Sequence, residues 1–514
     1  MKSVLNATPI KLISTFLILA LLLVAMPAQS AQAATITVST CDEASLKTAI
    51  SNAISGDTIT ISCSGTIVLT SIITIDKDLT IEGSGADQLA ISGNNTSMVF
   101  RINGSTLAEI TGLTIQNGYA SDDGGGLANA GTLTLTDVNF SNNSAADNGG
   151  GLYNFNGSVT LKDVTFSGNS AASSGGGAYN YHGAIELTNV VFFDNSATEN
   201  GGGLGNRDKA TLTDVIFLEN TASGSTSSAG GGMYGYAGGT TTELRNTTFS
   251  GNSAAYGGGM FNYRSNPSLT NVTFSDNSAT SSGGGLYNEG STPTLTNVTF
   301  TDNSATTSGG GIYNRIDAPT LKNVIIANST GGDCIGSLDS SSANNLIEDT
   351  GANACGLTNG ANGNIIGTDP DLGPLQNNGG FTQTHALLTS SDAIDKGANC
   401  PADDQRGVVR PQRAACDIGA YEAGASILIM SSSSPSTGAT LESLNSILVN
   451  FNEDALNDGS NKAANYADNY LLVERGANGS FDTLSCAGVV SDDLKQIISS
   501  ATYTNNGGSA VNDN

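Results

Sequence analysis

The sequence predicts an all-β protein organised as a right-handed parallel β-helix, and two observations carry this prediction. A Gly-Gly-Gly triplet begins eight times from Gly124 to Gly309, at spacings of 25 to 29 residues. Between the triplets the phrase Leu-x-x-Val-x-Phe recurs with polar residues interleaved, which is typical of strands that bury one face. A fixed period of this length indicates structural units stacked in a row. A β-propeller would need periods of about 40–50 residues.

Each turn of the coil is expected to contain three strands and three corners. The inward Leu and Phe columns are separated by Asp or Asn, which tolerate a left-handed corner. The glycine triplet supplies a second corner, and a third strand with one inward apolar residue follows it. About eleven coils spaced ~4.8 Å apart predict a rod on the order of 50 Å long. The Leu column is Leu135, Leu161, Leu187, Leu212, Leu244, Leu269, Leu295 and Leu321; the Phe column is Phe140, Phe166, Phe192, Phe217, Phe249, Phe274 and Phe300, with Ile115 and Ile326 at its ends; the corner residues are Asp137, Asp163, Asn189, Asp214, Asn246, Asn271, Asn297 and Asn323; the third strand points Leu127, Leu152, Leu204, Met260, Leu286 or Ile312 inward.

The N-terminal part divides into a targeting segment and the start of the coil. Residues 1–34 have the pattern of a secretory signal peptide, with an apolar run from Leu12 to Met26 and a small-residue cleavage pattern after it. Residues 35–110 are expected to form an N-terminal cap and the first coils. Helical spacing in residues 41–54 places Leu46, Ile50 and Ile54 on one face, so a short helix is predicted there.

Three further segments follow along the chain. Residues 111–330 are the β-helix repeat region, and residues 331–423 are expected to hold the final coils and a capping module. Residues 424–514 are interpreted as a Ser- and Pro-rich linker followed by a truncated β-sandwich. Seven cysteines in an exported chain indicate disulfides, and sequence proximity predicts three pairs with Cys486 free. The predicted pairs are Cys41–Cys63, Cys334–Cys355 and Cys400–Cys416.

The composition excludes several classes of partner. The chain carries 46 Asp and Glu against 19 Lys and Arg, for a net charge of −27. Nucleic-acid binding requires a basic footprint, so it is not expected. Past the signal peptide the sequence contains no apolar run long enough to cross a bilayer, so direct membrane insertion is not expected. The predicted localisation is secreted or cell-surface.

Three motifs resemble known families. The recurring Phe-x-x-Asn-Ser and Gly-Gly-[Leu/Ile/Met/Ala] phrases of residues 110–330 resemble the repeats of polymorphic outer-membrane proteins, which implies a β-helical adhesin of a bacterial surface. The segment beginning at Gly367 (GTDPDLGPLQNNGGFTQTHALL), with Asp392-Ala-Ile-Asp-Lys-Gly and Cys416-Asp-Ile-Gly-Ala-Tyr-Glu, resembles a choice-of-anchor module, which implies attachment to a bacterial cell surface. The segment from Ala439 (ATLESLNSILVNFNE) resembles the first strands of a bacterial Ig-like domain.

An aromatic column is the most suggestive surface feature. The residue after the inward apolar residue of the third strand must point outward, because alternate residues of a strand face opposite sides. Exposed rings spaced ~4.8 Å apart would stack on the sugars of an extended glycan. The alternative is that the rings stack on one another and stiffen the rod. The column is Tyr153, Tyr179, Tyr234, Phe261, Tyr287 and Tyr313, with Ala128 and Gly205 as interruptions, and Phe261, Tyr287 and Tyr313 are the predicted sugar platform.

Carboxylates offer an enzymatic alternative. Asp194 and Glu219 lie in adjacent coils, as do Asp276 and Asp302, and in register each pair would be ~5 Å apart, near the separation in a retaining glycosidase. β-Helical pectinolytic enzymes also place acids on neighbouring coils. Solvated turn acids are the favoured interpretation, with weak calcium binding as a further option and no other cofactor expected. His182 and His385 are isolated, and no Ser/His/Asp or Cys/His arrangement is identifiable.

The sequence therefore favours a non-catalytic surface protein for adhesion or glycan contact, and no catalytic residue is assigned. Its predicted partner is an extracellular polysaccharide or the surface of a host or neighbouring cell. A polysaccharide hydrolase or lyase of the pectinolytic type is the first alternative, since fold does not fix function. A structural spacer of the cell envelope is the second.

Overall fold

The structure is a computed structural model that describes residues 33–225, 227–236 and 242–424, together with the backbone of four strands further on. The chain divides into two compact units, Met1–Ala423 and Gly424–Asn514. In the second unit β39 (Met430–Ser434) pairs antiparallel with β40 (Leu448–Phe451), and β41 (Leu472–Glu474) with β42 (Leu494–Gln496). Residues 1–32 of the predicted signal peptide, Cys486 and most of the Ig-like segment lie outside the described residues, whereas the serines of the predicted linker, 431–434, belong to β39.

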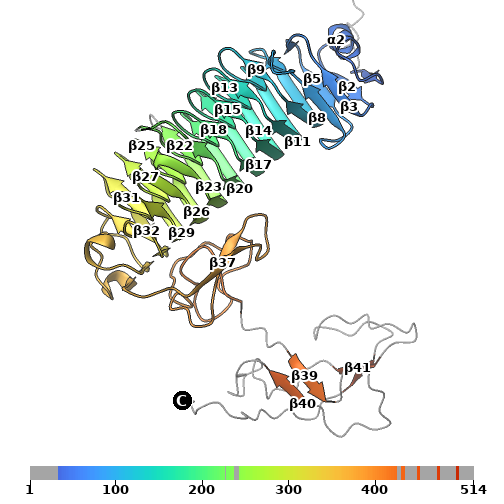
Figure 1. Ribbon diagram of the computed structural model, residues 1–514. Coiled ribbons are helices and arrows are strands. Elements are labelled where there is room, and N and C mark those ends of the chain that lie inside the picture. Colours follow the sequence, from blue (N-terminus) through green and yellow to red (C-terminus); the bar gives the residue numbers. More distant parts are fainter. Residues whose placement is uncertain are drawn as a thin grey trace, which may run out of the picture. The chain divides into compact units, whose positions relative to one another are not determined.

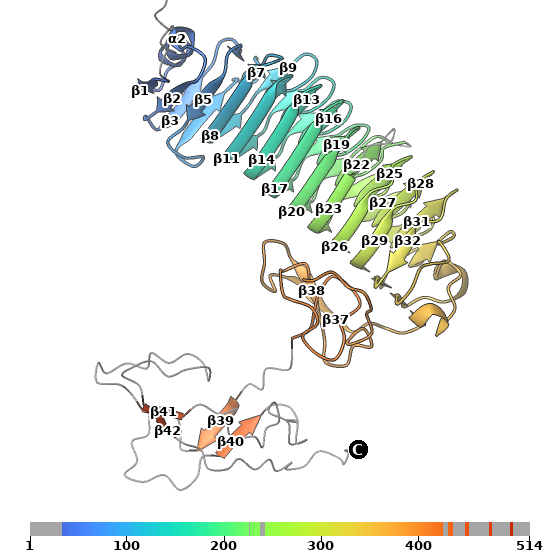
Figure 2. The same ribbon diagram turned by 180° about the vertical axis from the view of Figure 1, so that it is seen from behind.

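The first unit is a parallel β-solenoid made of three sheets, as Figures 1 and 2 show from opposite sides. Sheet A has 17 strands, sheet B 11 and sheet C 8, each paired in parallel with the coil before and after it. Sheet A is formed by β1 (Thr35–Val38), β2 (Asp57–Ile61), β3 (Gly65–Val68), β5 (Leu79–Glu82), β6 (Leu89–Ser92), β8 (Leu107–Gln116), β11 (Thr132–Ser141), β14 (Ser158–Ser167), β17 (Ala184–Phe193), β20 (Ala210–Leu218), β23 (Thr242–Ser250), β26 (Ser268–Ser275), β29 (Thr294–Thr301), β32 (Thr320–Lys322), β33 (Ile325–Ala327), β35 (Leu346–Ile347) and β36 (Ile365–Ile366).

Sheets B and C complete each turn with shorter strands. Sheet B consists of β4 (Ile73–Ile75), β7 (Phe100–Ile102), β10 (Leu127–Asn129), β13 (Leu152–Phe155), β16 (Ala178–Tyr181), β19 (Leu204–Asn206), β22 (Met233–Tyr236), β25 (Met260–Tyr263), β28 (Leu286–Glu289), β31 (Ile312–Arg315) and β34 (Cys334–Ile335). Sheet C consists of β9 (Tyr119–Ala120), β12 (Ser144–Ala145), β15 (Ser170–Ala171), β18 (Ser196–Ala197), β21 (Thr221–Ala222), β24 (Ser253–Tyr256), β27 (Ser278–Ser282) and β30 (Ser304–Ala305). The predicted parallel β-solenoid is confirmed.

The inward columns stack in the predicted register. Successive Leu and Phe residues are paired from coil to coil, and the Phe column ends on Ile115 and Ile326. Neighbouring Phe rings lie parallel with centroids 4.5–4.8 Å apart. Every member of both columns is buried. One continuous apolar core therefore runs along the solenoid.

The Asp and Asn corners are left-handed, as predicted. All eight have φ between 52° and 56°. In the central coils the corner lies inside one long strand such as β11, whereas at the two ends the flanking strands are separate, as with β5 and β6 or β32 and β33. The bend is therefore a fixed feature of the coil, and only its continuity with the flanking strands changes along the chain.

Two buried ladders of asparagine side chains are the main polar feature of the solenoid, and the sequence analysis did not predict them. In each ladder the Nδ2 of one Asn donates to the Oδ1 of the Asn one coil further on, at 2.8–3.0 Å. The first ladder is Asn143, Asn169, Asn195, Asn220, Asn252, Asn277 and Asn303, and the second is Asn129, Asn154, Asn180 and Asn206, then Asn262, Asn288 and Asn314.

The second ladder is interrupted at β22. The position that pairs with Asn206 on one side and Asn262 on the other is Gly235. Asn206 donates instead to Asp208 and Thr242, and the buried Oδ1 of Asn262 has no hydrogen-bond partner. A Cβ on Gly235 would lie 3.2 Å from that oxygen, with no closer neighbour. A side chain at this position therefore requires the Asn262 amide to shift by a few tenths of an ångström.

We expect Gly235→Asn to stabilise the protein by about 1 kcal/mol, because it would satisfy a buried acceptor. Thermal melting followed by circular dichroism measures this. Gly235→Ala is the matched control, since it removes the same backbone entropy without adding a donor. An equal rise in melting temperature for both variants would contradict the ladder explanation.

A helix and a disulfide lie at the start of the solenoid. In α2 (Glu43–Asn52) the side chain of Asp42 accepts a hydrogen bond from the Ser45 N–H, which caps the first turn. Leu46 and Ile50 are buried as predicted, but Ile54 is 46 % exposed. The helix ends before Ile54, so Ala49 takes the third buried position of that face.

The three predicted disulfides are present. Cys41–Cys63, Cys334–Cys355 and Cys400–Cys416 have Cα–Cα distances of 5.7, 5.0 and 6.4 Å, within the usual range for this bond. The second bond joins β34 to the turn after the 3₁₀ helix η1 (Gly351–Asn353), and a second 3₁₀ helix, η2 (Ala361–Gly363), precedes β36. All three lie outside the eight repeats, where fewer stacked neighbours stabilise the chain.

Residues 368–423, here called the lateral module, pack beside sheet A rather than over the end of the solenoid. Figures 1 and 2 both show its strands β37 (Leu372–Gln376) and β38 (Thr384–Leu387) close to β26 and β29. The contacts include hydrogen bonds from outward polar residues: Thr273 Oγ1 donates to Gln405 at 2.7 Å, and Asn297 Nδ2 donates to the carbonyls of Asp417 and Gly419. A buried apolar cluster also joins the module to the last strands of sheet A; it contains Leu387, Ala393 and Ile418 together with Ile325, Ala327 and Leu346. The capping position predicted for this segment is therefore wrong.

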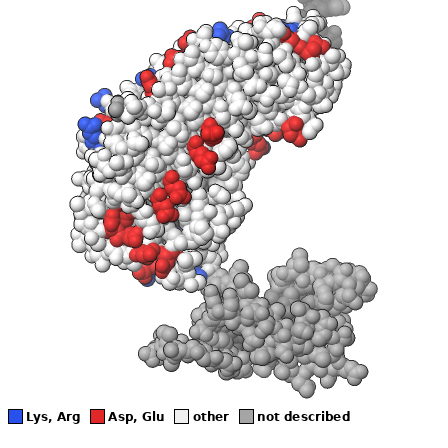
Figure 3. Space-filling model, viewed as in Figure 1, with Lys and Arg blue, Asp and Glu red and all other residues white. Residues whose placement is uncertain are grey.

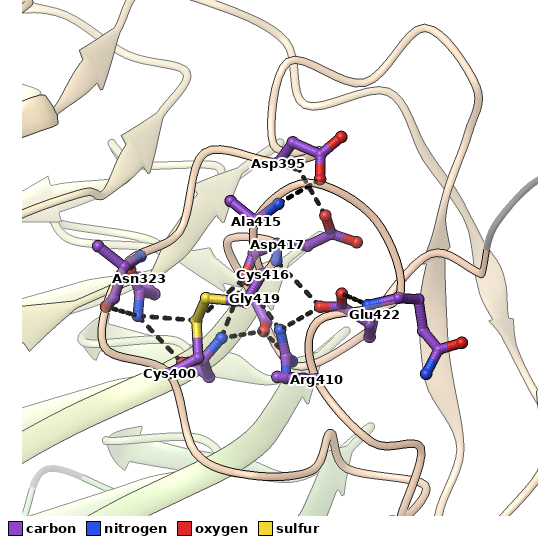
Figure 4. Close-up of a disulfide and its surroundings, with 12 residues drawn as sticks. Asn323, Asp395, Cys400, Arg410, Ala415, Cys416, Asp417, Gly419 and Glu422 are labelled. Atoms are coloured by element: carbon purple, nitrogen blue, oxygen red, sulfur yellow. Dashed lines mark hydrogen bonds and ion pairs between the residues drawn. A yellow bond between two sulfur atoms is a disulfide. The ribbon is translucent and has the colours of Figure 1, made fainter. Parts of the chain in front are cut away.

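The lateral module is held together by buried charges around its disulfide (Figure 4). Arg410 and Glu422 form an ion pair at 2.9 Å with side chains that are at most 1 % exposed. Asp417 accepts backbone N–H bonds from Asp395 and Ala423. Burial raises the pKa of Asp417 to about 6, and Glu422 adds to the shift. Breaking a buried pair of this kind costs several kcal/mol, so these residues fix the fold of the module.

Candidate functional site

Sheet B carries two parallel columns of outward aromatic side chains. The inner column consists of the six residues that the sequence singled out. The outer column lies two residues further along each strand and was not predicted, although the alternation of a strand places it on the same face. Its aromatic members are Phe155, Tyr181, Tyr236 and Tyr263, and Arg207, just after β19, takes the position between Tyr181 and Tyr236.

Most of the inner column is closed off by its own stacking. Tyr179, Phe261 and Tyr287 are only 7 %, 7 % and 4 % exposed. The centroids of Phe261 and Tyr287 are 4.8 Å apart, and those of Tyr287 and Tyr313 are 5.0 Å apart. The prediction that this part of the column exposes ring faces is wrong, because rings at the coil spacing cover one another.

The interruption of the columns at β19 is filled from within the protein. A Cβ on Gly205 would lie 2.5 Å from the ring of Tyr179, so only glycine leaves enough space for that ring. In the outer column the guanidinium of Arg207 lies over two rings, 5.2 Å from the centroid of Tyr181 and 4.6 Å from that of Tyr236. A cation therefore occupies the slot where the aromatic residue is missing.

The interruption at β10 is left open. Here Ala128 pairs with Tyr153, and Ala130 lies next to Phe155. A hollow of about 690 Å³ lies over these alanines, and its lining includes both aromatic side chains. Because Tyr153 stacks on Tyr179 and Phe155 on Tyr181 in the following coil, the opposite faces of the two rings are turned toward the hollow.

The two rings form one platform. Tyr153 and Phe155 come from the same strand and lie within 11° of parallel, with centroids 6.3 Å apart. Phe155 is 43 % exposed, and Tyr119, on the facing sheet C strand, is 41 % exposed. Of the six predicted glycan-binding residues, Tyr153 lines this hollow.

The edge of the hollow is charged. Arg101, one coil before Ala128, and the loop residues Asp122 and Asp123 line it. A carboxylate oxygen from each of Asp122, Asp123 and Asp147 lies within 4.8 Å of the others. Burial and the charges of the two neighbouring acids raise the pKa of Asp147, and burial together with Asp123 raises that of Tyr153. Figure 3 shows further acidic clusters on the face it draws, in line with the net charge of −27.

The four carboxylates considered for catalysis occupy corners. Asp194, Glu219, Asp276 and Asp302 are exposed, with φ between 52° and 58°. This geometry accounts for them as left-handed turn residues. Weak calcium binding was considered for these four acids. Among the described residues, the acids that lie close enough together to share a cation are those beside the hollow.

The two histidines lie in different environments. His182 is a left-handed turn residue whose ring lies edge-on to Tyr181, 4.2 Å between centroids. His385 is buried between the lateral module and sheet A, where Ser275 Oγ lies 3.0 Å from Nε2 and the Gly373 carbonyl lies 2.7 Å from Nδ1. Burial lowers the pKa of His385, so the neutral ring is favoured at this contact.

A comparison with protein families agrees with a surface β-helix. Residues 137–154, 163–181, 271–289 and 297–315 match the Chlamydia polymorphic membrane protein repeat, a family associated with the outer membrane or cell surface. No curated protein matches the chain. The crystal structure of pectate lyase Pel9A is 13% identical, with a TM-score of 0.38, over 77% of this chain and 97% of that chain. Among the described residues, no helix has the length and apolarity needed to cross a membrane.

Proposed function

We propose that this chain is an exported bacterial surface protein that contacts glycans without cleaving them, through the hollow at β10. The observation that carries the proposal is the platform of Tyr153 and Phe155, whose ring faces open into a hollow of about 690 Å³. Aromatic faces pack well against the apolar faces of sugar rings, and the polar edge supplies groups for the hydroxyls.

The position of the platform follows from the way in which the rings of each column stack on one another. A ring inside a stack has both faces covered, so only a ring at the end of a stack offers one to a ligand. Both columns end at β13, and the alanines of β10 leave space in front of them. Tyr313 ends the inner stack at the other side, but there Ile335 of the next coil pairs with it. We therefore assign glycan contact to Tyr153 and Phe155 instead of Phe261, Tyr287 and Tyr313.

We further propose that the lateral module is of the choice-of-anchor type and that the segment after it belongs to an Ig-like domain. The hydrogen bonds of the module to sheet A support a rigid junction with the solenoid. In this arrangement the β-helix would present the hollow while the region beyond residue 423 serves attachment.

The full chain should be screened against soluble polysaccharides by affinity electrophoresis, with release of reducing ends measured in parallel. Phe155→Ala is expected to weaken retention about tenfold or less, since an aromatic contact contributes about 0.5–1.5 kcal/mol. Tyr263→Ala is the matched control: it ends the same column at the other side, and Arg264 lies over its ring at 5.1 Å.

If Phe155→Ala and Tyr263→Ala both retain the polysaccharide as well as the unchanged protein does, the assignment of glycan contact to the hollow is overturned. Cleavage of a polysaccharide by the purified chain would overturn the non-catalytic role and favour the hydrolase or lyase alternative.

A further inference from the structure

The geometry points to a cationic, amine-bearing glycan as the ligand of the hollow, with one ammonium group seated on the face of Phe155. This inference rests on the proposed glycan contact and names the class of sugar that the site would select.

The first step of the argument is the internal example at β19. There the outer column lacks an aromatic residue, and the guanidinium of Arg207 fills the slot at cation–π distance from the rings on both sides. The same column is interrupted at β10 by Ala130, whose methyl group is too short to cover the ring of Phe155. The slot also has an aromatic wall, and among the described residues no cation–π contact to the Phe155 ring is found.

The second step is the charge around the slot. Asp122 and Asp123 line the hollow, Asp147 lies beside them, and Arg101 brings one guanidinium, so the formal net charge of these four groups is −2. Asp123 contacts the hydroxyl of Tyr153, so these acids lie at the Tyr153 end of the platform and favour a positive group in the hollow. The net charge of −27 on the whole chain also draws cations toward the surface and repels polyuronates.

The third step concerns the shape of the ligand. The platform extends over both rings, whose centroids are 6.3 Å apart, so a group larger than an isolated ammonium is needed to cover it. A sugar ring stacked on Tyr153 with a neighbouring amino sugar on Phe155 would use both rings. Arg101, on the opposite side, would then meet hydroxyl oxygens.

The test compares oligomers of equal length: glucosamine, N-acetylglucosamine and galacturonate, titrated into the full chain by calorimetry in the presence of a chelator. At a pH that protonates the amine, the glucosamine oligomer should bind about fivefold or more tighter than its neutral N-acetylated analogue. Added salt should reduce this preference, because the ion contacts lie at the surface.

Two substitutions should move the preference in opposite directions. Asp122→Asn should weaken binding of the glucosamine oligomer about threefold, and Arg101→Gln should strengthen it by a similar factor. Asp194→Asn, an exposed acid at a distant corner, is the charge-matched control and should leave binding unchanged. Opposite signs cannot come from a loss of folding, which would weaken both.

The remaining outcomes separate the two proposals. Equal binding of the amine and its N-acetylated analogue, both lost in Phe155→Ala, would overturn the cationic preference and leave glycan contact at the hollow standing. Oligolysine that binds through Phe155 while the glucosamine oligomer does not would overturn it in favour of a basic protein partner. Oligomers that all bind independently of Phe155, or not at all, would overturn the proposed function itself.

Discussion

Replacing Asn220 with leucine is expected to destabilise the solenoid by about 3–5 kcal/mol. The Oδ1 of Asn220 accepts bonds from the backbone N–H and the Nδ2 of Asn195, and its own Nδ2 donates to the Phe192 carbonyl and to Asn252. All these groups are buried, so the apolar side chain would leave several of them unsatisfied. Chemical denaturation followed by circular dichroism measures the loss.

Asn139→Ala is the matched control for Asn220→Leu. Asn139 lies on the outer side of β11, half-buried, and surface substitutions of this kind are usually within about 0.5 kcal/mol. Equal destabilisation by the two variants would show that the buried ladder contributes no more than an outward side chain.

Phe217→Ala is the second large effect, with an expected loss of about 3–5 kcal/mol. The ring lies between Phe192 and Phe249, with centroids 4.8 and 4.6 Å away, and is fully buried. Its neighbours are held in register by parallel strands on both sides, so they cannot collapse into the cavity. Thermal melting and denaturant titration measure the loss.

Phe193, which follows Phe192 in the preceding coil and pairs with Leu218, provides the control. Phe193→Ala removes a ring of the same kind from the outer face, where it is 37 % exposed, and is expected to cost less than about 1 kcal/mol. Similar losses for Phe193 and Phe217 would mean that the ring stack inside the solenoid contributes little beyond general burial.

The inward columns and the corners were predictable because each depends on one residue type at one position of the repeat. The Asn of Phe-x-x-Asn-Ser recurs just as regularly, and an Asn repeated beside a buried Phe is the signal for a ladder. In the prediction, that phrase indicated only a family resemblance. The disulfides were predictable because each pair lies close in sequence.

Two features could not be predicted from the repeat alone. Alternation correctly places Tyr287 on the outer face, but the covering of one ring by the next depends on ring orientation, which no sequence pattern specifies. The lateral position of residues 368–423 depends on contacts with residues more than a hundred positions earlier, such as Thr273 with Gln405. The strands that the module contacts do differ in sequence from the others. The outward residues of β26 and β29 are Thr and Ser, which can hydrogen-bond to the module, whereas those of β17 and β20 include Val191, Phe193 and Ile216.

The gap at Gly235 is expected to be a mechanically weak point of the solenoid, here called the seam. In a stacked repeat protein each coil is coupled mainly to its two neighbours, so strength is set locally, coil by coil. Two asparagine ladders join the coils before β22 and after it, but only one continues across it. The coils beyond the seam are also clamped by the lateral module, through partners such as Thr248 and Ser275. Under a pulling force, the rod should yield first at the seam and unravel the block that carries the hollow, while the clamped block stays folded.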